Sequence, residues 1–406
     1  MRDFLFVQPF LTPPGGGEGV ANWMLQALVS RGQVTVLTWD PPNFAEIDRY
    51  YGTSLEGHPN LHTQIVAPLF RKLFLRLRVP HRLLRVYWLE RAAKALRSSH
   101  RHCFSAYNEL DLGPPSVQYV HHPSQPKGVF GEPPCAWPDS PLLVRIWPLY
   151  LWLCRRLSPH DLGRIQKNIT VCNSHWTGRA LARLVNVPTH AVLYPPPLGR
   201  PLSSDPLLRR PDFISIARIE RTKNWLKLIE IIRRVRELGH EVKLSLAGSR
   251  EDPELLVELQ QLEQQHSDWL RLYLNEPREV LDRLIVEHQY AIHGMVQEHY
   301  GMAVAELVLS GCLTFVHDSG GQVEIVPQHE TRYTEVDDAV EKIHAVLTDE
   351  SLRRTLLADQ AKNRANITRE TFLADLHALV DRLESGETLR PIALREPDYQ
   401  NGEPER

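Results

Sequence analysis

The hydrophobic residues in the second half of this chain form short apolar runs separated by longer amphipathic stretches. The apolar runs are five to seven residues long and predict strands at 213–219, 242–248, 270–275, 290–294 and 313–318. The stretches between them predict helices at 224–239, 252–265, 278–288 and 302–311. Strands that alternate with helices in this way form a parallel sheet covered by helices.

The first half begins with the same alternation. A strand is predicted at 3–10, a loop rich in Gly and Pro at 11–19, a helix at 20–32 and a second strand at 33–39. Further strands are predicted at 116–123, 169–175 and 190–197. A chain of 406 residues exceeds one ordinary hydrophobic core, so the two series predict two doubly wound, Rossmann-like α/β domains that face a cleft.

The composition between the two series suggests the domain limits. A stretch rich in Pro and Ser separates them, so we expect an N-terminal domain over 1–198, a linker over 199–210 and a C-terminal domain over 211–368. A last helix at 369–385 is expected to pack back on the N-terminal domain. The polar tail at 386–406 is expected to be disordered.

Residues 68–101 depart from the alternation and predict a basic helical insertion. They hold ten Lys and Arg residues against the single acid Glu90, with Leu, Phe, Val and Trp between them. Together with the apolar segment 142–156, this insertion could lie on an anionic membrane. Alternatively, it buries its apolar face on the first domain and leaves its arginines in solvent. The sequence leaves both interpretations open.

Composition limits the partners and the compartment. The net charge is −2, which gives no electrostatic reason to expect a nucleic-acid partner. The five cysteines are scattered and form no Cys-x-x-Cys pair, so neither a zinc site nor a disulfide framework is indicated. No apolar run reaches the roughly 18 residues of a membrane-spanning helix. We therefore expect a cytoplasmic protein, with membrane association only at the surface.

A basic pair is the first constellation that suggests chemistry. Arg218 ends a predicted strand and Lys223 lies at the start of the next helix, so both fall at the carboxyl edge of a sheet, where doubly wound folds bind ligands. Such cations suit a leaving diphosphate. The chain has no Asp-x-Asp pair, which favours a solution without metal. Alternatively, both are solvated surface charges.

Two glutamates form the second constellation. Glu298 and Glu306 are eight residues apart, and Gly301 lies where the loop turns into a helix. The backbone N–H groups from Tyr300 through Met302 and the next residue would be unpaired at the helix start and suited to a phosphate. Carboxylates accept hydrogen bonds from vicinal hydroxyls of a sugar or ribose. The alternative is a helix with a solvated acid in its first turns.

In this context the sequence resembles glycosyltransferase family 4, whose members have the GT-B fold, retain configuration and need no metal. The resemblance covers most of the chain. Within the family it is most similar to α-1,2-mannosyltransferases that extend lipid-linked oligosaccharides. Besides the Glu-x₇-Glu pattern, it is carried by GGGE at 15–18, YVHHP at 119–123, NSHWT at 173–177, YPP at 194–196 and HGMVQEHYG at 293–301.

The resemblance implies roles for the residues of the second domain. Arg218 and Lys223 would bind the diphosphate, Glu298 would hold hydroxyls of the transferred sugar, and Glu306 the ribose. His293 would line the sugar pocket. Ala217, where the family usually has Gly, departs from the pattern but fits a strand.

In the first domain the resemblance implies that Gly16 and Gly17 let the backbone approach the diphosphate or the acceptor. His121 would lie near the acceptor and the reacting carbon. The alternatives are a simple Pro/Gly loop and a histidine satisfied by hydrogen bonds at a strand end.

These expectations add up to a retaining, metal-independent glycosyltransferase without a cofactor. Its donor would be a nucleoside-diphosphate hexose, with GDP-mannose as the leading candidate, and its acceptor a hydroxyl of a lipid-linked or polysaccharide glycan. A nucleotide-sugar epimerase, a phosphorylase and a non-catalytic nucleotide-sugar-binding subunit are the competing hypotheses. The intact set of basic and acidic residues argues against the last.

Overall fold

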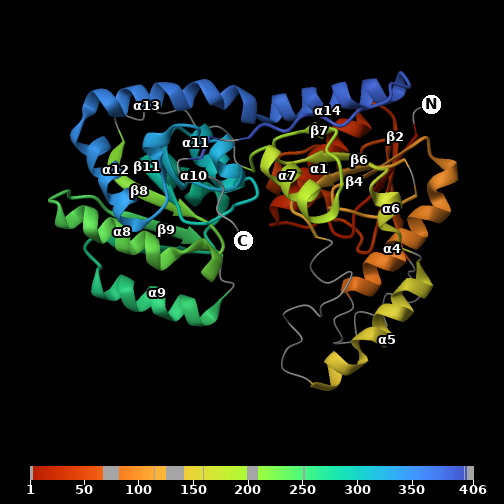
Figure 1. Cartoon of the computed structure of the whole chain (residues 1–406), viewed down its shortest axis with the longest axis horizontal. Coiled ribbons are helices and arrows are strands. Elements are labelled where there is room, and N and C mark those ends of the chain that lie inside the picture. Colours follow the sequence, from red (N-terminus) through yellow and green to blue (C-terminus); the bar gives the residue numbers. More distant parts are fainter. Residues whose placement is uncertain are drawn as a thin grey trace. The chain divides into compact units, whose positions relative to one another are not determined.

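A computed structural model describes residues 3–66, 82–113, 115–124, 141–158, 160–198, 209–249, 252–396 and 398–399. The chain divides into two compact units (Figure 1). The first unit is Met1–Pro196 with Phe372–Arg395, and the second is Pro197–Thr371 with Glu396–Arg406. Both are built on parallel sheets, so the predicted architecture of two Rossmann-like α/β domains is confirmed.

The first unit holds a seven-stranded parallel sheet in the order β3-β2-β1-β4-β5-β6-β7. Its strands are β1 (Asp3–Val7), β2 (Gln33–Thr38), β3 (Leu61–Ile65), β4 (His102–Ser105), β5 (Val117–Val120), β6 (Ile169–Cys172) and β7 (Ala191–Val192). Its helices include α1 (Gly16–Val29), α2 (Phe44–Tyr51), α4 (Arg82–Leu96), α5 (Pro141–Leu157), α6 (Leu162–Ile165) and α7 (His175–Val185). The 3₁₀ helix η1 (Arg97–Ser99) follows α4.

The second unit holds a six-stranded parallel sheet in the order β10-β9-β8-β11-β12-β13. Its strands are β8 (Arg210–Ile216), β9 (Leu244–Gly248), β10 (Leu270–Leu274), β11 (His288–His293), β12 (Leu313–His317) and β13 (Arg332–Tyr333). Its helices include α8 (Trp225–Glu237), α9 (Pro253–Gln265), α10 (Arg278–Glu287), α11 (Met302–Leu309), α12 (Val336–Thr348) and α13 (Glu350–Asn363).

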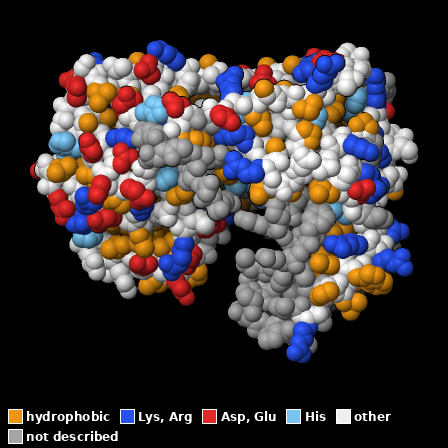
Figure 2. Space-filling model, in the orientation of Figure 1, with side chains coloured by type: hydrophobic (Ala, Val, Ile, Leu, Met, Phe, Trp, Pro, Cys, Tyr) orange, Lys and Arg blue, Asp and Glu red, His pale blue; other side chains and the backbone are white. Residues whose placement is uncertain are grey.

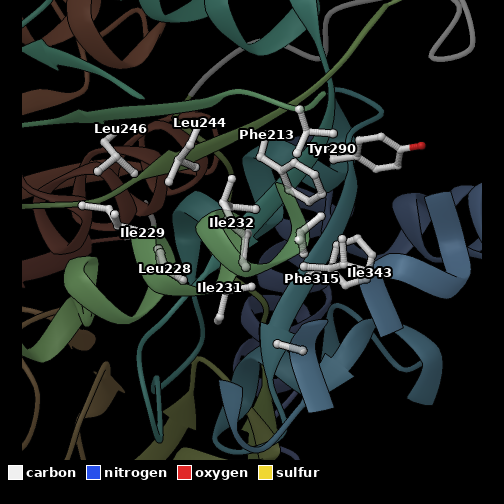
Figure 3. Packing of buried hydrophobic residues seen from close by; sticks show 14 of the residues in the cluster. Phe213, Leu228, Ile229, Ile231, Ile232, Leu244, Leu246, Tyr290, Phe315 and Ile343 are labelled. Atoms are coloured by element: carbon white, nitrogen blue, oxygen red, sulfur yellow. The ribbon is translucent and has the colours of Figure 1, made fainter. Parts of the chain in front are cut away.

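Side chains from α8 and the sheet fill the core of the second unit. Ile231 and Ile232 of α8 are fully buried, as are Phe213 of β8 and Leu244 of β9. Figure 3 shows Ile232 directed toward Phe213 and Leu244 of the sheet, while Ile231 lies on another side of α8. The central strands read as continuous apolar runs because helices cover both faces of a parallel sheet.

Local capping sets the helix ends. Asp252 accepts hydrogen bonds from the N–H groups of Glu254 and Leu255, and Pro253 opens α9, where its missing N–H is not needed. In the first unit Ser174 accepts from Thr177 N at 3.0 Å and begins α7. These caps fix where the loops at the sheet edges end.

The last helix, α14 (Arg369–Glu384), packs on the first unit from Phe372 onward. Arg31 after α1 pairs with Asp381 at 3.0 Å, and His377 Nε2 lies 3.2 Å from the carbonyl oxygen of Ala27. Phe372, like most residues on its side of α14, is buried.

The expectation of a disordered tail over 386–406 is wrong for its described part. Leu389 is buried, and the N–H of Ile392 donates to Thr189 O at 2.9 Å. Farther on, the N–H of Arg395 donates to His175 Nδ1 at 3.2 Å. Hydrogen bonds from the tail backbone order this polar segment, and composition alone does not reveal them. Residues 397 and 400–406 lie outside the described residues.

The basic insertion belongs to the fold where it is described. Residues 67–81 lie outside the described part, and the rest forms α4, η1 and the approach to β4. Arg85 of α4 lies over the rings of Phe10 and Trp39, and Lys94 pairs with Asp111 at 2.9 Å. These cations of α4 are therefore engaged within the first unit. Among the described helices, none has the length and hydropathy required to cross a bilayer.

Candidate functional site

The carboxyl edge of the second sheet brings three of the predicted residues together. β8 and β11 are neighbours; Lys223 follows β8 in the 3₁₀ helix η3 (Arg221–Lys223), and His293 ends β11. Glu298 lies in the next loop, with its carboxylate 2.6 Å from Lys223 Nζ and 3.3 Å from His293 Nε2. Lys223 and Glu298 are only 13% and 14% exposed. Residues 75 positions apart thus form one enclosed charged cluster.

The loops after β8 and β11 approach each other so closely that position 294 requires a glycine. A Cβ at Gly294 would come within 2.7 Å of the carbonyl oxygen of Lys223. Asn224, in the left-handed region with φ 53°, donates from its amide to Gly294 O at 2.8 Å. This hydrogen bond therefore connects the loops after β8 and β11 beside the cluster.

The electrostatics of the cluster keep Glu298 ionised. Burial alone would raise its pKa, but the hydrogen bond from His293 and the charge of Lys223 outweigh burial and hold the pKa of Glu298 well below its usual range. Burial lowers the pKa of His293, and the hydrogen bond with Glu298 only partly opposes this. A neutral His293 that donates from Nε2 to a charged Glu298 carboxylate is consistent with the lowered pKa of both residues. The cluster can offer a cation to an anion and a carboxylate to hydroxyl donors.

The start of α11 lies beside Glu298, where the sequence places a glycine. Gly301 has φ 100°, a conformation that disfavours other residues, and α11 begins at Met302. A Cβ at Gly301 would lie 3.5 Å from Glu298 Cγ. The first N–H groups of the helix, including that of Met302, have no acceptor within it and carry its positive dipole end. Tyr300 is buried just before this turn.

Sequence reasoning missed the loop after β12, which holds Glu298 in place. Gly321 N donates to Glu298 O at 2.6 Å, and Ser319 Oγ accepts from Gln297 N at 2.7 Å. Gly320 has φ 73°, and a Cβ there would meet the backbone of Glu298 at 2.3 Å. The signal that could have revealed this loop is the Ser-Gly-Gly run directly after a predicted strand.

Two predicted residues stand apart from the cluster. Arg218 lies after β8 at the same sheet edge, but its side chain is 61% exposed and pairs with Glu220 at 2.5 Å. Glu306 is in α11 and pairs with Arg278 of α10. The two glutamates of the Glu-x₇-Glu pattern therefore have different basic partners.

In the first unit the structure brings Gly17 and His121 together. Gly16 and Gly17 open α1, and a Cβ at Gly17 would lie 3.5 Å from His121 Nε2. Nε2 lies 3.0 Å from Ala106 O, so its proton is assigned to that bond and Nδ1 carries the lone pair. Burial lowers the pKa of His121 to about 4, so the imidazole is neutral near pH 7.

A second loop that sequence reasoning missed fixes the position of His121. Asn108, with φ 53°, accepts through Oδ1 from the N–H of His121 at 2.9 Å and of His122 at 3.3 Å. Glu109 accepts from the Ser124 hydroxyl at 2.5 Å. We call this loop, residues 106–109, the histidine clamp.

One group of described residues has the composition of a metal site. Ligand atoms of Glu90, Asp111 and His160 lie within 4.8 Å of one another in the first unit. Lys94 at 2.9 Å and Arg164 at 2.6 Å already neutralise Asp111, and His160 Nδ1 lies 2.9 Å from Glu90. These contacts tie α4 to the segments after β4 and α5, so we assign this group a structural role.

A surface pocket of about 500 Å³ lies elsewhere on the second unit. Arg209, Val242 and Gln289 line it, so it lies at the amino-terminal ends of the strands. Ligands of open parallel sheets bind at the carboxyl ends. The pocket includes none of the predicted site residues, and we do not place a donor there.

Comparisons with known proteins relate the second unit to one family and the whole chain to one fold. Residues 204–364 match the family model described as glycosyl transferases group 1. The human GDP-Man:Man(3)GlcNAc(2)-PP-Dol alpha-1,2-mannosyltransferase is 25% identical over 271 residues, 59% of this chain and 54% of that protein. The Caenorhabditis elegans enzyme of the same name is 26% identical over 183 residues, 40% of this chain and 38% of that protein. The chain thus spans about half the length, or less, of these relatives.

Solved structures share the fold. Anabaena Alr3699/HepE in complex with UDP and glucose has a TM-score of 0.62 at 14% identity, covering 95% of this chain and all of that one. WaaG, a glycosyltransferase involved in lipopolysaccharide biosynthesis, has a TM-score of 0.60 at 12% identity, covering 94% of this chain and 99% of that one. Residues 204–364 therefore match the glycosyl transferases group 1 family, and the chain shares the GT-B fold of these structures.

Proposed function

We propose that this protein is a glycosyltransferase that moves a hexose from a nucleoside-diphosphate sugar to a hydroxyl of a lipid-linked or polysaccharide glycan, with retention and without a metal. GDP-mannose is the favoured donor, because the human and nematode relatives are named for GDP-mannose and a dolichol-linked acceptor. A lipid-linked acceptor would be presented at a membrane, so the enzyme would work there as a peripheral protein.

The Lys223–Glu298 pair beside the start of α11 is the observation that carries the proposal. Lys223 and the N–H groups of α11 would bind the diphosphate, whose charge grows as the bond to the sugar breaks. Glu298 would accept hydrogen bonds from hydroxyls of the transferred sugar, with His293 holding its carboxylate. A cation and a helix N-terminus together can stabilise the leaving group, which supports a reaction without metal.

Residues of the first unit would serve the acceptor side. The Nδ1 lone pair of a neutral His121 can accept a hydrogen bond from a sugar hydroxyl. Gly16 and Gly17 have no side chains of their own at the start of α1, which would let a ligand approach its backbone N–H groups. Retention would follow from attack on the face that the leaving phosphate departs from, with that phosphate accepting the proton.

The experiment is a thermal-shift panel with GDP, UDP, ADP and their sugars, followed by assay of the stabilising donor with glycan acceptors. A ligand present at 100 times its Kd stabilises the folded state by about 2.7 kcal/mol. We expect one base to stand out and NMR of the product to show the donor's anomeric configuration. Inversion would refute retention, and epimerisation of the donor without acceptor would instead establish the epimerase. Stabilisation by a donor without transfer to any acceptor would favour the binding subunit.

A further inference from the structure

Helix α5 of the first unit has apolar side chains on two opposite faces. One face is internal: Leu151 and Cys154 are buried, and the hydroxyl of Tyr150 accepts from Leu84 N of α4 at 3.0 Å. On the other face Leu149 is 65% exposed and Trp152 is 55% exposed. Packing inside the first unit therefore leaves Leu149 and Trp152 of this helix exposed.

Basic residues flank the exposed apolar face. Positions 145, 149, 152 and 156 are spaced by four, three and four residues, which places them in one row along the helix. Arg145 and Arg156 are exposed at the two ends of this row, with Arg155 beside the second. The Arg156 guanidinium lies 5.7 Å from the centre of the Trp152 ring. Figure 2 shows hydrophobic and basic side chains gathered over α5, whose sequence contains no acid.

This clustering sets α5 apart from the rest of the described surface. Its exposed apolar face comprises Leu149, Trp152 and Leu153, the last 47% exposed. The other large exposed hydrophobic residues belong to different elements, as ordinary surface residues do: Tyr50, Leu184, Leu238, Val257, Val296 and Ile392. Arg85 and Lys94 of α4, by contrast, are held by aromatic rings and an acid of the first unit.

We propose that the exposed face of α5 docks this protein on an anionic lipid bilayer. Leu149, Trp152 and Leu153 enter the interface, while Arg145, Arg155 and Arg156 bind lipid phosphates. The charge pattern favours a bilayer over a second copy, because a symmetric contact of α5 with itself would set arginines against arginines with no acid between them. The inference rests on the proposed function only in linking this docking to a lipid-linked acceptor.

Flotation with vesicles of phosphatidylcholine, alone or mixed with phosphatidylserine, tests the docking without any substrate. The wild-type protein should float with the mixed vesicles at low salt and dissociate as salt screens the charges. Replacing Arg145, Arg155 and Arg156 with Gln should weaken binding about fivefold per arginine, hence about 10²-fold in total, and flatten the salt dependence. Replacing the three apolar residues with Gln should abolish flotation.

Matched controls separate this face from general surface chemistry. Arg183→Gln with Leu184→Gln changes an exposed basic-apolar pair on α7 and should leave flotation unchanged. Brominated lipid should quench the wild-type tryptophan emission more than that of Trp152→Phe, which keeps the apolar ring. Wild-type protein that ignores anionic vesicles, or control variants as weak as the α5 variants, would overturn the proposal.

Two further outcomes keep the docking and the proposed function distinct. The α5 variants should retain transfer to a water-soluble glycan acceptor, because the helix lies outside the residues assigned to donor and acceptor. If the protein binds vesicles through α5 but transfers no sugar, the proposed function is refuted and the docking proposal stands. Self-association that the apolar substitutions abolish, without vesicle binding, would make this face a contact between copies and refute the bilayer.

Discussion

Asn108 in the histidine clamp offers a sharp test of how the first unit holds His121. Its Oδ1 accepts two backbone N–H groups, and its backbone has φ 53°. Asn108→Gly keeps this left-handed conformation accessible and removes the acceptor. Asn108→Asp keeps an acceptor of the same shape and also tolerates the conformation. The pair of variants therefore separates the hydrogen bonds from the backbone strain that an alanine would add.

The magnitude follows from the exposure of the two donors. His122 is exposed, so water can take over its N–H, whereas His121 is partly buried. An unsatisfied buried N–H is unfavourable by about 1–3 kcal/mol, and partial burial places this one at roughly 1–2 kcal/mol. If productive binding needs the His121 segment in this position, kcat/KM for transfer falls about 5- to 30-fold in Asn108→Gly. Asn108→Asp should recover most of it.

Three measurements make the test specific. Steady-state kinetics should show the loss in transfer, while calorimetry shows unchanged nucleoside diphosphate affinity, because the diphosphate is assigned to the second unit. NMR titration should show the pKa of His121 moving from about 4 toward its ordinary value in Asn108→Gly as the imidazole becomes hydrated. A folded Asn108→Gly variant with wild-type kinetics and an unmoved pKa would refute the positioning role.

Three other predictions address the cluster, the metal and the pH dependence. Glu306→Gln should weaken the binding of donor and of free nucleotide alike, mainly as a higher KM. Glu298→Gln should lower kcat by about 10²-fold and leave nucleotide affinity undiminished. Similar losses of nucleotide binding in both variants would contradict the assignment. Turnover should survive excess EDTA, and activity that disappears and returns with Mg²⁺ or Mn²⁺ would show a metal. Burial, with the charges of Arg395 and Arg179, lowers the pKa of His175 to about 4. Between about pH 6.5 and pH 4 only the unfolded state binds this proton, so the stability of the folded state should fall as the pH drops through this range. His175→Gln should flatten that fall in a series of thermal melts, and a melting temperature that rises on acidification would contradict the sign.

Most of the second unit could be predicted because its pattern is strong. Each of its five predicted strands and four predicted helices exists, with ends shifted by a few residues. In the first unit β3 (Leu61–Ile65) was missed, since three of its five residues are polar and exposed. The helix α1 begins at Gly16, inside the predicted loop. Glycine disfavours helices, so helix propensity alone does not predict a start there.

The site was less predictable than the fold for a definable reason. Strand ends place Lys223 and His293 at one edge of the sheet, which topology alone predicts. That Glu298 turns back to meet Lys223 depends on the loop after β12, where Gly320 packs against the Glu298 backbone. Similarly, Asn108 gives no chemical signal in the sequence, because its role is carried by one side-chain oxygen and a left-handed backbone. Such contacts depend on packing between loops that no periodic pattern encodes.

The pairing of Lys223 with Glu298 bears on how a donor would be selected. A buried charge needs a partner of opposite charge. Lys223 and Glu298, 2.6 Å apart, are each other's partner. Under the proposed function a diphosphate takes the place of Glu298 beside Lys223, so Glu298 must find donors elsewhere. Sugar hydroxyls provide them, and His293 continues to donate to the same carboxylate. A nucleoside diphosphate without its sugar pairs with Lys223 but provides no hydroxyl donors for Glu298, so this buried carboxylate is left poorly paired. Under this proposal the ion pair would favour the intact sugar nucleotide over the diphosphate that remains after transfer, which is the order that turnover requires.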